Sequence, residues 1–529
     1  MSTRRDALKT VLLGAAGAAA APCEANAAQA ASTWRQGVEG QRVADQGDGT
    51  FLNPIMPGDH PDPTILKVGD TYYMTFSSFD ASPGIIIWRS QDLVNWAPVG
   101  PALTKPIGSV WAMDLVHHRN RFYIYIPATP NNQQTIMVIH ADRIEGPWSD
   151  PIDLHISGRI DPGHVVGEDG KRYLFVNGGD RVRLRDDGLA TDGPLEHGYD
   201  LWRYPDDWVV EMYSAEGPKL IKRNGYFYLI AAIGGTSGPA TGHMVVVARS
   251  RSVFGPWEQC PHNPIIRTTD PNDRWWSRGH ATPVEGPGGD WWIIYHGYEN
   301  GYRTLGRQTL LEPIEWTDDG WFRARGGDLS QPLPKPRGGR SGPTGQALSD
   351  DFSTNKFGVQ WSFYEPAANE LSRIHYEPHA LRIAGKGADP RDCSPLLFNV
   401  GDHAYEVSVT LEPAHGAQGG LLLFYSKRGF VGFGVDGRKM FTYNYGQPHG
   451  WLNIPALSER VQLKITNDHQ IVTMRYSLDG QTWLQHPWQN EVSGYHQNVL
   501  GDFLSLRPAL YSAGAGEVRF TDFRYRGLA

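Results

Sequence analysis

Five times in its first two thirds, the chain repeats a turn residue followed by paired aromatic residues. These repeats lie at residues 69–73, 120–123, 169–173, 224–228 and 289–292. Asn-Gly and Asp-Gly turns suit β-hairpins because both residues tolerate positive φ, and the aromatic residues that follow favour strands. Repeats of this length with several strands each are typical of propeller blades. The repeat therefore predicts a five-bladed β-propeller over residues 48–330; five unrelated hairpins in sandwiches are the alternative.

The chain changes character after the fifth repeat. Residues 331–347 are rich in proline, glycine and basic side chains, which is typical of a linker. Beyond it, residues 348–529 contain short alternating segments such as Val407, Val409 and Leu411 without helical periodicity. Short strands separated by turns indicate a β-sandwich. We therefore expect an all-β chain, with a propeller followed by a sandwich.

Composition limits the function classes. The chain has 40% hydrophobic and 20% charged residues and a formal net charge of −8. These values are typical of a soluble globular protein, and without a basic stripe they argue against nucleic acid as a partner. The 18 tryptophans suit sugar binding, because an indole face stacks on the C–H face of a pyranose. Of the three cysteines, we expect Cys260 and Cys393 to be buried thiols; a single bridge is the alternative.

The N-terminus has the pattern of an export signal. Arg4 and Arg5 precede a short apolar run, and Ala25-Asn26-Ala27 is a small-x-small cleavage pattern. The paired arginines favour a twin-arginine signal over residues 1–27 and an exported protein, periplasmic or extracellular, with no membrane association after cleavage. An ordinary secretory signal is the alternative, and a lipoprotein anchor at Cys23 is disfavoured by the residues before it.

Three carboxylates open three different repeats. Asp62 precedes the first inner strand, Asp114 the second and Glu216 the fourth. The inner strands of a propeller line its central channel, so these side chains should converge at one end. Taken singly, each acid is typical of a turn or a cap. Taken together they indicate chemistry, because burying an unpaired charge near the axis is costly.

These segments resemble glycoside hydrolase family 43, the five-bladed propeller xylosidases and arabinofuranosidases. The likeness rests on three segments, Pro61-Asp62-Pro63, Trp111-Ala112-Met113-Asp114-Leu115 and Glu216-Gly217-Pro218, over about residues 48–330. Met113 departs from the family pattern, in which proline is common. The C-terminal part resembles the jelly-roll, concanavalin-like sandwich that accompanies many β-xylosidases of this family.

The resemblance implies three catalytic roles. Asp62 would be the general base, Glu216 the general acid, and Asp114 the group that orients Glu216 and keeps its pKa high. An inverting glycosidase needs one ionised and one protonated carboxyl group, about 6.5–9.5 Å apart. A neighbouring like charge and an apolar wall raise the pKa of the acid.

The resemblance also implies residues that bind the sugar. Phe79 and Trp111 would form walls of the pocket, and Arg307 would contact the terminal sugar. His280 resembles the channel histidine of the family, which can face water or a structural calcium ion; no cofactor is otherwise required. The alternatives are core aromatic residues for Phe79 and Trp111, a surface ion pair for Arg307 and a structural hydrogen bond for His280.

Other segments carry weaker signals. We expect a structural role for Asp161, which repeats the Asp-Pro pattern at the third blade, and an aromatic contribution to the pocket from residues 496–503. Residues 432–437 fit G-x-G-x-x-G, but no helix is expected after them, which argues against a dinucleotide site. His117 and His118 have no partner ligands at metal-binding spacing.

The predicted function is release of terminal β-D-xylose from xylo-oligosaccharides, by inversion and in an exo manner. The closest alternative is an α-L-arabinofuranosidase, or both activities in one pocket. Endo-arabinanase is disfavoured by the C-terminal domain, and a non-catalytic sugar-binding protein by the three intact carboxylates. The partner is an oligosaccharide substrate, and the sequence does not determine the oligomeric state.

Overall fold

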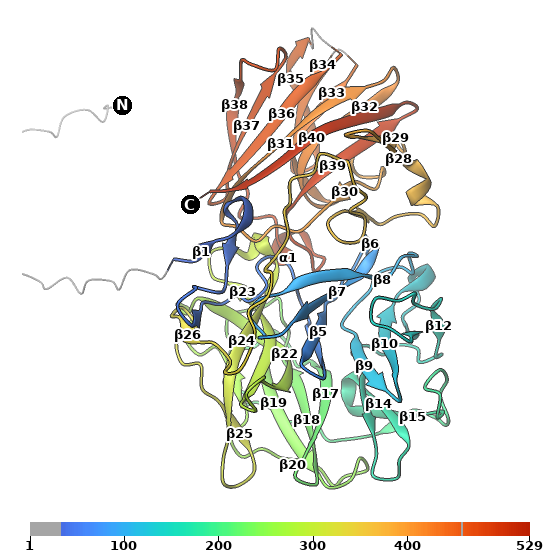
Figure 1. Cartoon of the computed structure of the whole chain (residues 1–529), viewed down its shortest axis with the longest axis vertical. Coiled ribbons are helices and arrows are strands. Elements are labelled where there is room, and N and C mark those ends of the chain that lie inside the picture. The colour runs from blue at the N-terminus through green and yellow to red at the C-terminus, as the bar shows by residue number, and fades with distance from the viewer. Residues whose placement is uncertain (1–32, 438, 456–458, 529) are drawn as a thin grey trace, which may run out of the picture.

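The computed structural model describes residues 33–437, 439–455 and 459–528, and almost all its regular elements are strands. A propeller forms the lower half of the molecule and a β-sandwich the upper half (Figure 1). The expected all-β architecture, with five blades followed by a concanavalin-like domain, is confirmed. The expected signal peptide, residues 1–27, lies outside the described residues.

Each blade is an antiparallel sheet whose strands follow the chain order. Blade I consists of β4 (Thr64–Val68), β5 (Thr71–Thr75), β7 (Gly84–Ser90) and β8 (Ala97–Leu103). Blade II consists of β9 (Asp114–His118), β10 (Arg121–Ala128), β11 (Thr135–Ala141) and β12 (Ile152–Asp153). Blade III consists of β13 (Gly163–Val166), β14 (Arg172–Val176), β15 (Asp180–Leu184) and β16 (Glu196–His197). Blade IV consists of β17 (Ala215–Arg223), β18 (Tyr226–Ile233), β19 (Met244–Ser250), β20 (Glu258–Gln259) and β21 (Ile266–Arg267). Blade V consists of β22 (Trp275–Glu285), β23 (Trp291–Glu299), β24 (Arg307–Trp316) and β25 (Phe322–Ala324).

The first strand of each blade lies innermost. Around the axis, β4 contacts β9 and β22, β17 contacts β13 and β22, and β13 contacts β9. The second strands are packed between neighbouring strands and are rich in aromatic and β-branched residues, as in β18 and β23. The loops that enter β4, β13, β17 and β22 therefore meet at one end of the channel.

The segment expected as a linker helps to close the ring. Within this segment, β26 (Leu333–Pro334) pairs with β3 (Thr50–Phe51). Beside β3, the Asn53 side chain exchanges two hydrogen bonds with the backbone of Leu311 in β24. Lys335 Nζ lies 2.7 Å from Asp45 and 3.0 Å from Asp92. Residues 331–347 are thus packed along the propeller, joining the first and last parts of its chain.

The sandwich is built from two antiparallel sheets. One sheet has the order β35 (Gln447–Pro455), β34 (Lys439–Asn444), β33 (Gly429–Asp436), β32 (Ala417–Ser426), β39 (Arg507–Gly514), β30 (Leu396–Leu397), β27 (Ser362–Tyr364) and β6 (Ala81–Ser82). The other has the order β28 (Ile374–Glu377), β29 (Ala380–Ala384), β40 (Glu517–Gly527), β31 (Ala404–Pro413), β36 (Val461–Asp468), β37 (Ile471–Ser477) and β38 (Leu484–Glu491). The alternating residues Val407, Val409 and Leu411 point into the core between the sheets.

The remaining elements are short. They are β1 (Arg35–Gln36), β2 (Arg42–Val43), the helix α1 (Gln497–Leu500) and the 3₁₀ turns η1 (Val38–Gly40), η2 (Pro130–Asn132), η3 (Asn177–Gly179), η4 (Arg303–Leu305) and η5 (Glu370–Arg373). Within the described residues no helix has the length and apolar character to span a membrane. Cys260 and Cys393 are buried free thiols.

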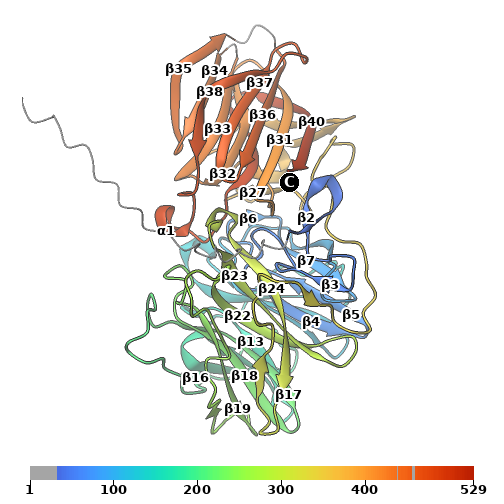
Figure 2. The same cartoon turned by 90° about the vertical axis from the view of Figure 1, so that its left-hand side faces the viewer.

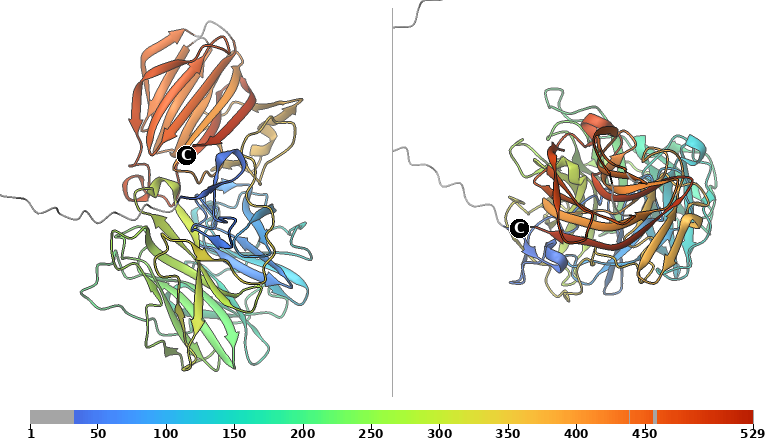
Figure 3. Two further views of the ribbon diagram at one scale, coloured as in Figure 1. Left: turned by 60° about the vertical axis from the view of Figure 1, so that its left-hand side comes forward. Right: turned by 90° about the horizontal axis from the view of Figure 1, so that it is seen from above.

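The two domains share a sheet. The strand β6, which belongs to the propeller chain, pairs with β27 at the edge of the sandwich sheet. The sandwich covers one end of the propeller, and α1 lies where the two domains meet (Figures 2 and 3). Because β6 follows Phe79 by two residues, the sandwich holds in place the propeller loop that carries this side chain.

Candidate active site

Backbone conformations outside the usual region mark the channel entrance. Asp62, Asp161 and His280 have φ values of 56°, 56° and 53°, in the left-handed region that few non-glycine residues adopt. Pairing is also interrupted by β-bulges in β17 after Glu216 and in β22 on both sides of Gly279. Strain and bulges of this kind aim side chains into functional sites.

Asp62 is a buried carboxylate held by two hydrogen-bond donors. Arg307 Nη1 donates to Oδ1 at 2.8 Å, and Ser77 Oγ donates to Oδ2 at 2.6 Å. Burial alone would raise its pKa, but Arg307, His280 and a contact with His296 hold the pKa well below its usual value. Asp62 is therefore ionised at neutral pH, as a general base must be.

His296, which the sequence analysis missed, fixes the backbone of Asp62. Nδ1 of His296 lies 3.1 Å from both the backbone nitrogen and the Oδ1 of Asp62, and its Nε2 lies 3.2 Å from Oγ1 of Thr236. Burial lowers the pKa of His296 well below its usual value, so the ring is neutral. No motif distinguishes Ser77 or His296 from other polar residues of the chain.

Glu216 lies across His280 from Asp62. His280 Nε2 lies 3.2 Å from Oε1 of Glu216, and Ser214 Oγ donates to Oε2 at 3.0 Å. The side chain of Glu216 is 17% exposed, against 4% for Asp62 and 3% for Asp161. Of the three carboxyl groups, Glu216 is thus the one best placed to reach a bound molecule.

Asp161 joins this cluster, although a structural role was expected. Its Oδ2 accepts from the backbone N–H of Gly217 at 3.0 Å and lies 3.6 Å from His280 Nε2. Burial, together with the charges of Glu216 and Asp62, raises the pKa of Asp161 to about 7. Burial opposes ionisation of Glu216 too, but the hydrogen bond and charge of His280 lower its pKa to about 2. The two pKa values describe the successive loss of two protons from the interacting pair of Asp161 and Glu216, so the pair keeps one proton up to about pH 7.

The charges of the cluster balance when it holds that proton. Although burial acts against it, the carboxylates of Asp62, Asp161 and Glu216 raise the pKa of His280 to about 9. Three carboxylates beside two cations, His280 and Arg307, leave one uncompensated negative charge in a buried site. Retaining one proton on a carboxyl group removes that charge, which the low dielectric of the site favours.

Asp114 has a different place from the one predicted. Its Oδ1 pairs with Lys219 Nζ at 2.8 Å, and its Oδ2 accepts from the backbone N–H of His164 at 2.7 Å. Thr64 Oγ1 also contacts it, at 3.2 Å, and no contact with Glu216 is found among the described residues. Asp114 therefore links the inner strands of blades I to IV. Its carboxylate, which was expected to face the general acid, is instead paired with Lys219.

An aromatic cluster from both domains lies beside these charges. Phe503, from the loop after α1, stacks on Phe79 at 6.1 Å and meets Trp111 edge-on at 6.1 Å. The Arg307 guanidinium lies over the rings of Phe503, at 5.1 Å, and Phe79, at 5.5 Å. The Trp111 indole N–H is buried without a partner among the described residues, so it is free to bond a ligand. All four predicted sugar-binding residues thus adjoin the carboxylate cluster.

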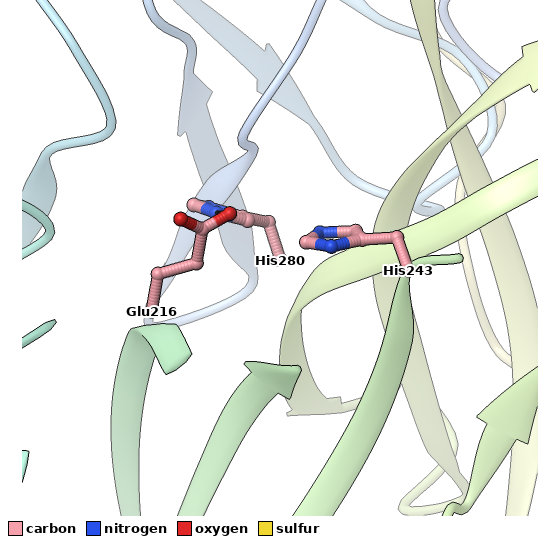
Figure 4. Close-up of side chains that lie close together, drawn as sticks. All are labelled: Glu216, His243 and His280. Atoms are coloured by element: carbon pink, nitrogen blue, oxygen red, sulfur yellow. Dashed lines mark hydrogen bonds and ion pairs between the residues drawn. The ribbon is translucent and has the colours of Figure 1, made fainter. Parts of the chain in front are cut away.

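The donor set near His280 does not fit calcium. Within the described residues, Glu216, His243 and His280 form the one group whose ligand atoms could meet at an ion (Figure 4). Ca²⁺ takes six to eight oxygen ligands, whereas this group offers one carboxylate and two imidazoles. His280 is also already engaged by three carboxylates.

The sequence motifs set aside at the outset lie in ordinary structure. Residues 432–437 lie within and just after β33 of the sandwich, and β34 follows them. His117 packs against Phe122 at 4.6 Å, and neither it nor His118 belongs to a potential metal-binding group of the described residues.

Comparisons with known proteins agree with this architecture. The model of the family "Glycosyl hydrolases family 43" matches residues 51–322, and that of the "Beta xylosidase C-terminal Concanavalin A-like domain" matches residues 349–526. The chain is 27% identical over 522 residues to a xylan 1,3-β-xylosidase of a Vibrio species, covering 89% of this chain and 94% of that protein.

Two further relatives cover different shares of the chain. A non-reducing end α-L-arabinofuranosidase of Bacteroides ovatus is 31% identical over 361 residues, 64% of this chain and 65% of that protein. A solved xylan β-1,4-xylosidase of Bacillus halodurans is 27% identical with a TM-score of 0.79, covering 90% of this chain and 99% of that one. The carboxylate cluster at the mouth of a five-bladed propeller and the family match over residues 51–322 lead to one conclusion: the chain is a glycosidase that belongs to glycosyl hydrolase family 43.

Proposed function

We propose that the protein is an exo-acting β-xylosidase that inverts the anomeric carbon of the terminal xylose. The observation that carries the proposal is the placement of Asp62 and Glu216 on opposite nitrogens of His280. One carboxyl group is ionised, while the other shares a retained proton with Asp161. The aromatic cluster closed by Phe503 favours a pocket for a chain end. Xylosidases among the full-length relatives support the choice of sugar.

The geometry supports a single displacement. Asp62 removes a proton from a water molecule, whose oxygen bonds to the anomeric carbon as the glycosidic C–O bond breaks. Glu216 gives its proton to the departing oxygen, so one water is consumed and no charge is left on either sugar. The His280 ring holds the two carboxyl groups apart, with Nδ1 at 3.5 Å from Asp62 and Nε2 at 3.2 Å from Glu216. A histidine ring between the two groups is compatible with the separation of about 6.5–9.5 Å that inverting enzymes need for the attacking water.

We assign the role of raising the pKa of Glu216 to Asp161 and not to Asp114. A carboxylate modulates a neighbour through its unneutralised charge. Asp161 faces His280 beside Glu216, whereas the charge of Asp114 is neutralised by Lys219 at 2.8 Å.

A pair of neutral variants separates these roles. In Asp161→Asn the like charge beside Glu216 is lost, so the proton of the acid leaves more readily. We expect the alkaline limb of the kcat/KM profile to move to lower pH by about 1–3 units. Asp114→Asn should keep the position of that limb and lower the Tm, because it leaves Lys219 buried without a counter-charge. Equal shifts of the limb in both variants would contradict the assignment.

Phe503 tests whether the sandwich contributes to substrate binding. Phe503→Ala removes the ring that stacks on Phe79 and meets Trp111 edge-on, and aromatic pairs contribute about 0.5–1.5 kcal/mol each. We expect KM for an aryl β-D-xyloside to rise about 3–10-fold with a smaller change in kcat. Phe254→Ala, at an exposed position on blade IV, is the control and should leave KM unchanged. An unchanged KM in Phe503→Ala would place the substrate elsewhere.

The substrate is decided by comparing two leaving-group assays. Release of p-nitrophenol from the β-D-xylopyranoside should exceed release from the α-L-arabinofuranoside, and NMR should show the first-formed xylose with inverted configuration. Dominant turnover of the arabinofuranoside would favour the second candidate, which the Bacteroides ovatus relative supports. A retained configuration would exclude the single displacement.

We also propose that the enzyme acts after export by the twin-arginine route. The support is the Arg4-Arg5 pair and the cleavage pattern before residue 28. Arg4→Lys with Arg5→Lys should leave the protein in the cytoplasm, as fractionation and immunoblotting would detect.

A further inference from the structure

A second cavity lies between the propeller and the sandwich. It has a volume of about 180 Å³ and is lined by both domains. The propeller contributes Asp59, Ser77 and Phe79, and the sandwich contributes Gln360 and Arg507. Asp62, Asp161 and Glu216 are absent from the described residues that line it. The cavity is therefore distinct from the sugar pocket, although Ser77 and Phe79 border both.

Arg507 brings an unpaired charge into this cavity. Arg507, the first residue of β39, is 4% exposed, and its Nε and Nη2 are buried without a hydrogen-bond partner. Its guanidinium makes neither a hydrogen bond nor an ion pair with any described residue. Burial lowers the pKa of Arg507, although Asp59 and Asp80 lie close enough to oppose the change. Burying a cation without partners costs free energy, so we expect the Arg507 guanidinium to bind a ligand.

The free edge of the guanidinium defines the chemistry of that ligand. Nε–H and Nη2–H lie on one side of the planar group and point in parallel, which matches the two oxygens of a carboxylate. The same cavity is lined by three further buried atoms without partners, Ser78 Oγ, His60 Nδ1 and Gln360 Oε1. Because apolar residues such as Phe79 and Leu504 also line the cavity, it suits a small molecule with both polar and apolar parts.

The acids that face Arg507 do not take the place of such a ligand. Asp59 Oδ1 already accepts from the backbone N–H of Arg307 at 3.1 Å. Burial raises the pKa of both Asp59 and Asp80 to about 6. Neither acid forms an ion pair with Arg507.

We propose that the interdomain cavity binds a small carboxylate of about the size of acetate, held side-on by Arg507. About six waters would fill 180 Å³ at 30 Å³ each, so such an anion fits with space for ordered water. The site reaches the catalytic base through Ser77, which lines the cavity and donates to Asp62. The proposal goes beyond the glycosidase activity and is independent of which sugar is cleaved.

The test is thermal unfolding of the whole protein in acetate. Chloride is replaced stepwise by acetate at pH 7 and constant ionic strength, so only the shape of the anion changes. We expect the Tm to rise with the logarithm of the acetate concentration above the Kd, by about 1–2 °C at tenfold excess over the Kd. A Tm that does not respond to acetate would overturn the proposal and indicate that the cavity holds only water.

Two substitutions locate the acetate. Arg507→Lys keeps the charge but removes the paired donors, and Arg507→Met removes both; each should lose most of the acetate-dependent shift. Arg391→Lys, at an exposed position of the sandwich, is the control and should keep it. A full shift in Arg507→Lys would overturn the proposal by placing the acetate elsewhere. If Arg507→Met fails to fold, calorimetric titration of acetate into the wild type and Arg507→Lys gives the same decision. The p-nitrophenyl assays judge the glycosidase function separately.

Discussion

Asp62→Asn is expected to lower kcat for an aryl β-D-xyloside about 10²–10⁴-fold, the usual contribution of a general base. The amide keeps the shape of the side chain, so the contacts with Ser77 and Arg307 can be largely retained while the basic oxygen is lost. The loss should be the same for good and poor leaving groups, because the base acts on water. Steady-state kinetics over several aryl xylosides measures it.

Asp92→Asn is the matched control for this loss. Asp92 is buried and receives several hydrogen bonds, as Asp62 does, but it lies in a turn of blade I that pairs with Lys335. Its variant should keep kcat while lowering the Tm. An Asp62→Asn enzyme with near wild-type kcat would show that another group activates the water.

Glu216→Gln is expected to have an effect that depends on the leaving group. The amide cannot donate the proton, so kcat/KM for xylobiose or phenyl xyloside should fall about 10²–10⁴-fold. A 2,4-dinitrophenyl xyloside needs little protonation of its leaving oxygen, so its hydrolysis should fall much less. The slope of log kcat/KM against leaving-group pKa measures this difference.

The pH dependence of the same variant gives an internal check. In the wild type, activity should decline as pH rises above about 7, where Asp161 and Glu216 lose their shared proton. With the dinitrophenyl substrate, Glu216→Gln should lose this decline because no proton is needed. An equal loss of activity for all leaving groups would indicate damage to the pocket and not removal of an acid.

Local patterns in the sequence identified much of the site. Asp62 and Glu216 stand out because each is followed by proline or glycine at the start of an inner strand. Phe79, Trp111, His280 and Arg307 follow from the family resemblance. The Asp-Pro pattern at Asp161 was visible too, but it gave no sign that this side chain lies beside His280. Ser77 and His296 left no signal, because a lone serine in a loop or a lone histidine in a strand is indistinguishable from a structural one.

The choice between Asp114 and Asp161 could not be made from the sequence. Both acids stand at the start of an inner strand. Their roles differ because Lys219 reaches across the channel to Asp114, whereas the Gly217 N–H and His280 meet Asp161. These contacts depend on the bulge after Glu216 and on how far each blade is rotated about the axis.

The sequence by itself determined the repeat and the all-β class, because these follow from local turn chemistry and strand composition. Its motifs indicated the family and the catalytic candidates through their resemblance to known members. Only the tertiary structure decided which acid faces Glu216, that Phe503 of the sandwich reaches the pocket of the propeller, and that Arg507 is left unpaired between the domains. Closing the ring and docking the sandwich bring together residues hundreds of positions apart. The electrostatic field at each carboxyl group depends on its distances in space to the surrounding charges, and local sequence patterns do not reveal these distances.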